Sequence, residues 1–158
     1  MGWSRSVLIV EDNPVDVDLI AQAVEETGIV ESVTVANDGI QAIEMLLGHN
    51  GYKGLGNPDL ILMDLNLPGK SGLEVLTFIK AEPLLRQIPV VVLSGSDSEH
   101  DIRSAYRLHA NCYVTKSMDI DDYQDKVRLA ADFWLRIAHL PSSPPPDMEV
   151  LRQPVSRH

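Results

Sequence analysis

The sequence predicts an α/β domain in which helices cover both faces of a parallel β-sheet. Two observations support this prediction: short apolar segments of strand length recur along the chain, and each is followed by a segment whose apolar residues have helical spacing. Several strand candidates are apolar at every position, which is typical of strands covered on both faces. Five successive strand–helix units therefore indicate a doubly wound domain with a parallel sheet.

The predicted strands are short, and most are rich in branched apolar residues. They lie at 7–10 (VLIV), 33–36 (VTVA), 60–63 (LILM), 90–93 (VVVL) and 112–115 (CYVT). The predicted helices lie at 14–27, 39–47, 72–81, 98–108 and 120–139. Asn13 is the expected N-cap of the first helix, with Pro14 in its first turn. In the second helix, Ile40, Ile43 and Leu47 form the expected apolar face.

Two stretches fall outside the repeating pattern. The Gly-rich segment 48–58 follows a helix rather than a strand, so it is predicted to be a flexible connection and not a phosphate-binding loop. One domain is therefore expected over residues 1–140. The segment 141–158 begins PSSPPP and has too little apolar content to pack alone, so a disordered tail is expected there.

Composition and charge exclude several classes of function. The net charge is −10 and no cluster of Lys and Arg offsets it, so nucleic-acid binding is not expected. No apolar run approaches the roughly 20 residues that a membrane helix needs, so no membrane association is expected. Cys112 is the only cysteine, which excludes an internal disulfide and is consistent with a cytoplasmic protein.

Polar side chains follow four of the predicted strands. Glu11 and Asp12 come after the first, Asp64 and Asn66 after the third, Ser94 after the fourth and Lys116 after the fifth. Ligands of open α/β sheets bind at the carboxyl ends of the strands. We therefore expect these acids, the hydroxyl and the ammonium to meet in one crevice.

This set of groups is suited to phosphoryl transfer. Carboxylates this close repel one another, and a hard divalent cation such as Mg²⁺ removes the repulsion. Ser94 and Lys116 provide a hydrogen-bond donor and a positive charge for the oxygens of a transferring phosphoryl group. Asp64 is the predicted acceptor, as in enzymes that form aspartyl phosphates.

A nucleotide-binding loop is rejected. Gly69-Lys70-Ser71 matches the end of the pattern G-x-x-x-x-G-K-[ST], but the first glycine of that pattern would fall at position 64. Asp64 occupies that position, and its carboxylate would repel a nucleotide. Pro68 also removes a backbone N–H from a loop that would act through such groups.

The sequence resembles a response-regulator receiver domain over about residues 5–140. The segments that carry the resemblance are, in order, VLIVEDNP, ANDG, LILMDLNLPGKSG, PVVVLSGS and CYVTK. The resemblance implies a flavodoxin-like (βα)5 fold with strand order 2-1-3-4-5. It also implies phosphorylation of Asp64 by a sensor histidine kinase in a two-component phosphorelay.

The resemblance further implies a role for each site residue. Asp12, Asp64 and the backbone carbonyl of Asn66 would hold Mg²⁺, and Glu11 would act through water. Ser94 and Lys116 would bind the phosphoryl oxygens, and Tyr113 would be the aromatic switch that follows Ser94. One departure concerns the residue after Lys116, where the family usually has proline and this chain has Ser117.

A narrower resemblance is to the small regulators that partner with bacterial phytochromes. It is carried by the lengthened Gly-bearing loop before the third strand and by the segment AADFWLRIAHLP near the end of the last helix. It implies a bacterial phytochrome as the kinase.

The last helix carries two apolar stripes, and a single sheet face cannot cover both. They are Tyr123, Val127, Ala131, Trp134 and Ala138, and Leu129, Phe133, Ile137 and Leu140. An exposed apolar surface usually marks an interface. We therefore hypothesise a homodimer or a docking face through this helix, with Phe133, Trp134 and Ile137 at the contact.

The function expected from these observations is that of a single-domain response regulator that catalyses only its own phosphoryl transfer and dephosphorylation. The alternative is a receiver-like interaction module that phosphorylation does not regulate, although such modules tend to lose an acid or the lysine. An enzyme acting on small phosphoesters would need a substrate pocket or cap, and the only long insertion is the Gly-rich segment 48–58.

Overall fold

A computed structural model describes residues 5–49, 51 and 56–141 of the chain, and all structural statements concern these residues. Five strands form one sheet in the order β2-β1-β3-β4-β5, and every neighbouring pair is parallel. The strands are β1 (Arg5–Val10), β2 (Val30–Ala36), β3 (Leu60–Asp64), β4 (Val90–Ser94) and β5 (Cys112–Thr115). The predicted fold class and strand order are therefore confirmed.

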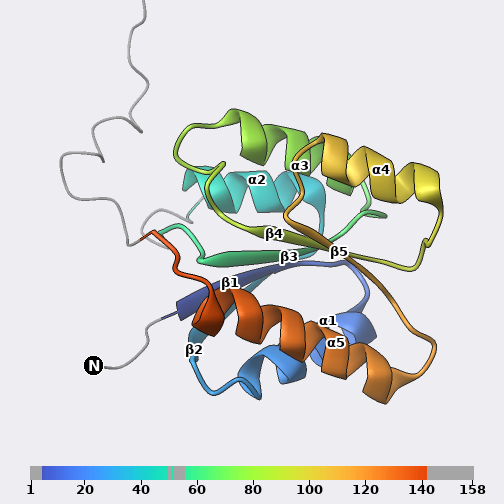
Figure 1. Ribbon diagram of the computed structural model, residues 1–158. Coiled ribbons are helices and arrows are strands. Elements are labelled where there is room, and N and C mark those ends of the chain that lie inside the picture. Colours follow the sequence, from blue (N-terminus) through green and yellow to red (C-terminus); the bar gives the residue numbers. More distant parts are fainter. Residues whose placement is uncertain (1–4, 50, 52–55, 142–158) are drawn as a thin grey trace, which may run out of the picture.

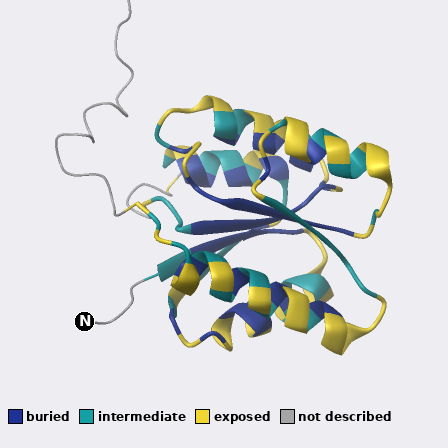
Figure 2. Cartoon of the chain, viewed as in Figure 1, coloured by how far each residue is buried: buried dark blue, intermediate teal, exposed yellow. Residues whose placement is uncertain are grey.

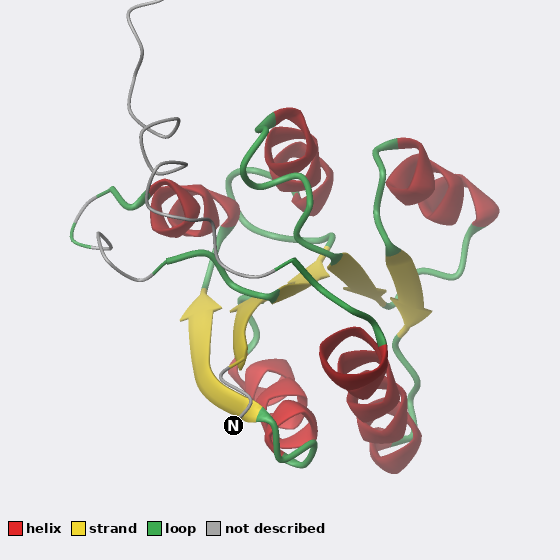
Figure 3. Cartoon of the chain, turned by 60° about the vertical axis from the view of Figure 1, so that its left-hand side comes forward, coloured by secondary structure: helices red, strands yellow, loops and turns green. Residues whose placement is uncertain are grey.

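Four helices connect the strands and a fifth follows the last strand, and together they cover both faces of the sheet (Figures 1 and 3). They are α1 (Pro14–Glu25), α2 (Gly39–Leu47), α3 (Gly72–Ala81), α4 (Glu99–Arg107) and α5 (Ile120–Asp132). Helices α1 and α5 lie on one face, and α2, α3 and α4 lie on the other. Among the described residues, no helix has the length and apolar character needed to span a bilayer.

The core consists of two apolar layers separated by the sheet. Side chains of β1 alternate between them, with Leu8 and Val10 on the side of α2–α4 and Val7 and Ile9 on the side of α1 and α5. Strands β3 and β4 are buried at every position, whereas the edge strand β5 is half-buried, as Figure 2 shows. The continuously apolar sequences of β3 and β4 follow from this central position.

The predicted apolar face of α2 is confirmed for Ile43, which packs against the core, and is wrong for the other two residues. Ile40 and Leu47 are 51% and 42% exposed, and the residues that pack on the sheet are Ala42, Met45 and Leu46. Almost every position of this helix is apolar, so periodicity alone could not identify the inward face. The close contact of Gly39 with the backbone of Lys70 helps to fix which side of the helix faces inward.

The last helix differs from the uninterrupted helix predicted over 120–139. Helix α5 ends at Asp132 and continues as a π-helical turn, Phe133–Ile137, closed by a 2.8 Å hydrogen bond from the Ala138 N–H to the Phe133 carbonyl. A π turn shifts the register of the residues that follow it. The buried row is therefore Tyr123, Val127, Ala131 and Leu135.

Because of this register shift, neither predicted apolar stripe is buried along its whole length. Trp134 is half-buried rather than part of the inward row, and Leu140 is also half-buried. The remaining members of the second stripe, Leu129, Phe133 and Ile137, are exposed by 58%, 46% and 64%. An apolar surface along this helix is therefore present, as expected. The tail predicted over 141–158 lies, except for its first residue, outside the described part of the chain.

Gly72 tests how tightly α3 packs against the end of β3. A Cβ atom at this position would lie 2.4 Å from the Asp64 carbonyl oxygen and 2.6 Å from the Leu65 Cα. We predict that Gly72→Ala lowers the free energy of unfolding by about 1–3 kcal/mol, because backbone atoms must move. Urea denaturation measures this loss. Gly95→Ala is the control, since nothing lies within 4 Å of its Cβ position, and an equal loss in both variants would contradict the packing argument.

Candidate functional site

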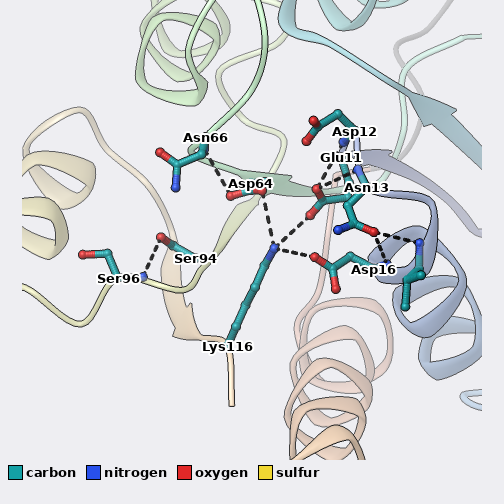
Figure 4. Close-up of polar contacts among 10 residues, drawn as sticks. Glu11, Asp12, Asn13, Asp16, Asp64, Asn66, Ser94, Ser96 and Lys116 are labelled. Carbon is teal, nitrogen blue, oxygen red and sulfur yellow. Dashed lines mark hydrogen bonds and ion pairs between the residues drawn. The ribbon is translucent and has the colours of Figure 1, made fainter. Parts of the chain in front are cut away.

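The carboxyl ends of β1, β3, β4 and β5 lie together, and the structure gathers the predicted site residues there (Figure 4). Glu11 and Asp12 follow β1, Asp64 ends β3, Ser94 ends β4 and Lys116 follows β5. The parallel register places Asp64 opposite Leu93, and Ser94 opposite Thr115. The Lys116 N–H donates to the Ser94 carbonyl at 2.7 Å, which fixes where the lysine side chain begins.

The Lys116 ammonium occupies the centre of this cluster. Its Nζ lies 3.0 Å from Glu11 Oε1, 3.0 Å from Asp16 Oδ2 and 3.4 Å from Asp64 Oδ2. Burial by itself would lower the pKa of Lys116, but its hydrogen bonds to Glu11 and Asp16 and the charge of Asp64 outweigh burial and raise that pKa. The ammonium therefore stays charged throughout the physiological range.

The Glu11 side chain is buried, with only 2% of its surface exposed. Its Oε2 accepts hydrogen bonds from the backbone N–H groups of Asp12 and Asn13, at 3.1 and 3.2 Å. Burial raises the pKa of Glu11 to about 7 despite the hydrogen bond from Lys116, and the Asp64 carboxylate acts in the same direction as burial. Both oxygens of the Glu11 carboxylate therefore accept hydrogen bonds.

Asp64 is also buried, and a short local turn orients its carboxylate. Its Oδ1 accepts a hydrogen bond from the Asn66 N–H at 3.1 Å, and its Oδ2 faces Lys116. Helix α3 lies close behind, because the Gly72 N–H donates to the Leu65 carbonyl at 2.9 Å. One oxygen of the carboxylate is thus held by backbone and the other points into the cluster.

Glu11, Asp12 and Asp64 each offer an oxygen within 4.8 Å of the other two, which is the spacing of a metal-binding group. The charges fit a cation as well. With Asp16 the cluster contains four carboxylates and the single ammonium of Lys116, so it remains strongly negative when its acids are ionised. An all-oxygen donor set of this charge suits a hard divalent ion.

Ser94 and Tyr113 are connected through the loop that leads into α4. The buried Ser94 Oγ accepts a hydrogen bond from the Ser96 N–H at 3.2 Å, and the Tyr113 hydroxyl donates to the Ser96 carbonyl at 2.8 Å. A reorientation of the Ser94 hydroxyl therefore changes the partner of Ser96, which in turn contacts Tyr113. Ser96 Oγ also contacts Asp101 Oδ2, which joins this loop to α4.

The segment Gly69-Lys70-Ser71 has a structural role. Ser71 is the N-cap of α3 and forms a capping box with Glu74, and Gly69 adopts a positive φ of 73° in the preceding turn. Lys70 lies 3.9 Å from Glu74 on the surface and has no contact with the acidic cluster. This geometry agrees with the rejection of a nucleotide-binding loop.

Asp16 is the site residue that sequence reasoning missed. It lies inside α1, four residues after Asp12, whereas the acids predicted for the site directly follow or end strands. The available signal was the helix itself: Asn13 caps α1 by accepting from the N–H groups of Val15 and Asp16, so the first turn of α1 borders the crevice (Figure 4). An acid in that turn could have been included on this ground.

The comparison with known proteins agrees with the fold and the site. The family model described as response regulator receiver domain matches residues 7–128. The chain therefore belongs to the response regulator receiver family, a class of signalling proteins that accept a phosphoryl group in two-component systems.

Particular relatives connect the chain to phytochrome response regulators. Response regulator Rcp1 of Synechocystis sp. is 40% identical over 139 residues, covering 88% of this chain and 95% of the relative. The crystal structure of the phosphorylated cyanobacterial phytochrome response regulator RcpA has a TM-score of 0.84 at 44% identity, covering 88% and 99% of the two chains. The crystal structure of the Mn²⁺-bound form of Rcp1 has a TM-score of 0.81 at 41% identity. The match covers 87% of this chain and 99% of that chain.

A pH titration of stability tests the environment of Glu11. A carboxyl whose pKa rises from 4.5 to about 7 on folding contributes stability that is fully present below pH 4.5 and is lost as the pH rises through 7. In EDTA, we predict that this contribution falls by about 3.5 kcal/mol at most, given roughly 1.4 kcal/mol per pKa unit.

The difference between the parent and Glu11→Gln isolates this contribution, because glutamine does not titrate. Urea denaturation between pH 4.5 and 8 measures the difference at each pH. A pH-independent difference would show that Glu11 titrates normally. Saturating Mg²⁺ should flatten the dependence, because a cation near the carboxylate favours its charged form.

Proposed function

We propose that Asp64 is the phosphoacceptor and that it receives the phosphoryl group from the phosphohistidine of a sensor kinase. The observation that carries this proposal is the position of the Asp64 carboxylate: one oxygen is oriented by the Asn66 N–H, and the other lies 3.4 Å from the Lys116 ammonium, inside a metal-binding group of acids. In the transfer, an Asp64 oxygen forms the new bond to phosphorus while the bond to the histidine nitrogen breaks.

The residues around Asp64 are proposed to bind the phosphoryl oxygens and the metal ion. Lys116 pairs with the oxygens of the incoming phosphoryl group, and the Ser94 hydroxyl donates a hydrogen bond to one of them. Asp12, Asp64 and the backbone carbonyl of Asn66 are the proposed ligands of Mg²⁺, with Glu11 acting through water. When bound, the ion neutralises charge that develops on the phosphoryl oxygens.

The proposed conformational response to phosphorylation begins in the loop that contains Ser94. When the Ser94 side chain rotates toward the phosphoryl group, its Oγ moves away from the Ser96 N–H, and Ser96 is the residue whose carbonyl accepts from the Tyr113 hydroxyl. Tyr113 is therefore the proposed switch residue. The roughly −1.5 to −2 charge of the phosphoryl group supplies the difference in interaction energy between the two states.

A bacterial phytochrome is the proposed kinase, supported by the relatives described as phytochrome response regulators. The cytoplasm is the proposed location, in keeping with a single free cysteine whose pKa is raised by burial. The chemistry proposed for the protein is limited to its own phosphorylation and dephosphorylation.

Intact-mass analysis after incubation with acetyl phosphate and Mg²⁺ tests the acceptor. We predict one added phosphate in the parent, none in Asp64→Asn, and parent-like labelling in the control Asp97→Asn, an exposed acid of the loop before α4. Labelling of Asp64→Asn equal to the parent would assign the phosphate to another residue. An unlabelled parent would favour an interaction module that phosphorylation does not regulate.

A homodimer through the last helix is the second part of the proposal. Leu129, Phe133 and Ile137 are exposed at four-residue intervals, and Phe133 packs edge-on against Trp134 with ring centroids 5.1 Å apart. Acids and bases alternate around this row, as in the pairs Asp125–Arg128 and Asp132–Arg136. Two copies can therefore approach here without net repulsion, despite a chain charge of −10, and a two-fold contact needs such a self-complementary surface.

Sedimentation equilibrium measures the dimer directly. We predict that Ile137→Asp weakens self-association at least about tenfold, because a charge would be buried at the contact. Leu47→Asp is the control, since Leu47 is a comparably apolar and exposed residue on α2, across the sheet from α5. Equal dissociation constants for the two variants, or a monomeric parent in both phosphorylation states, would contradict the proposed interface.

A further inference from the structure

Asp16 contacts Lys116 but is not part of the metal-binding group. Of the three carboxylates bonded to the Lys116 ammonium, Glu11 and Asp64 belong to that group with Asp12, whereas Asp16 does not. In Figure 4, Asp16 reaches Lys116 from α1, to the right of the ammonium, whereas Asp64 lies above it. Its function therefore concerns the lysine rather than the metal.

An ammonium group has three N–H donors, and Lys116 uses one for each carboxylate. A phosphoryl group on Asp64 brings new anionic oxygens to the same nitrogen. Phosphorylation removes the charge of the Asp64 carboxylate and frees one N–H of Lys116, so Lys116 must give up a further hydrogen bond to hold a second phosphoryl oxygen. The question is which carboxylate it releases.

The three partners differ in how firmly they are held. Glu11 Oε2 accepts two backbone hydrogen bonds and its side chain is 2% exposed; Asp64 Oδ1 accepts one backbone hydrogen bond and its side chain is 9% exposed. Asp16 is 26% exposed, and Lys116 is the only hydrogen-bond partner that the described structure gives its carboxylate. Asp16 can therefore leave Lys116 and be solvated by water, whereas the buried Glu11 cannot.

We propose that Asp16 is a positioning residue that holds Lys116 in the unphosphorylated protein and competes with the phosphoryl group for it. Phosphorylation then requires Lys116 to exchange the Asp16 carboxylate for phosphoryl oxygens. The strength of the Asp16 contact sets part of the barrier to phosphoryl transfer. This inference rests on the proposed roles of Asp64 and Lys116.

The test is the initial rate of phosphorylation by acetyl phosphate at saturating Mg²⁺, followed by intact mass. Asp16→Asn should raise the maximal rate about fivefold, the size expected from releasing one partly exposed ion pair. Asp16→Glu restores a carboxylate and should return the rate to within about twofold of the parent value. A residue that only supported the fold would slow phosphorylation when replaced, not accelerate it.

Asp18→Asn is the matched control, because it removes the same charge from an exposed position of the same helix. It should leave the rate unchanged within about twofold. This control distinguishes the loss of the contact with Lys116 from the loss of one negative charge near the site. The inference is overturned if Asp16→Asn behaves like Asp18→Asn or is slower than the parent. In either case the parent still becomes phosphorylated, whereas failure of the proposed function would abolish labelling of the parent itself.

Discussion

The Lys116 ammonium, surrounded by carboxylates from three elements, is the interaction on which the site depends. It lies between Glu11 at the end of β1, Asp16 in α1 and Asp64 at the end of β3, and its own backbone is bonded to Ser94 at the end of β4. Without this charge, four acids would face one another in a largely buried space. One ammonium reduces the repulsion without removing it, and the remaining negative charge is what attracts a divalent cation.

The fold provides this arrangement through the sheet. Parallel strands bring the residues that follow them to one edge, and the central strands β1, β3 and β4 are fixed by apolar layers on both faces. Tight packing continues to the site, because α3 approaches the end of β3 so closely that only glycine fits at position 72. The polar groups therefore rest on a rigid support, while the loop containing Ser94 and Ser96 has exchangeable hydrogen bonds.

The sequence was informative where one physical effect dominates. Continuous apolar runs identified the buried strands, and strand ends identified Glu11, Asp64, Ser94 and Lys116 as neighbours. Sequence reasoning failed where several residues satisfy the same pattern, as in α2, whose apolar residues occupy nearly every position. It also failed where local geometry departs from the ideal helix, as in the π turn that brings Leu135 inward, and it missed Asp16 because a helix rather than a strand positions that acid.

A crystal structure of the protein with Mg²⁺ and beryllofluoride tests the central claim most directly, since beryllofluoride imitates a phosphoryl group on a carboxylate. The account predicts beryllium on Asp64, Lys116 Nζ and Ser94 Oγ within hydrogen-bond distance of fluorine atoms, and Mg²⁺ bound to Asp12 and Asp64. Beryllium on a different carboxylate, or a Lys116 ammonium that keeps its acidic partners and does not contact fluorine, would contradict it.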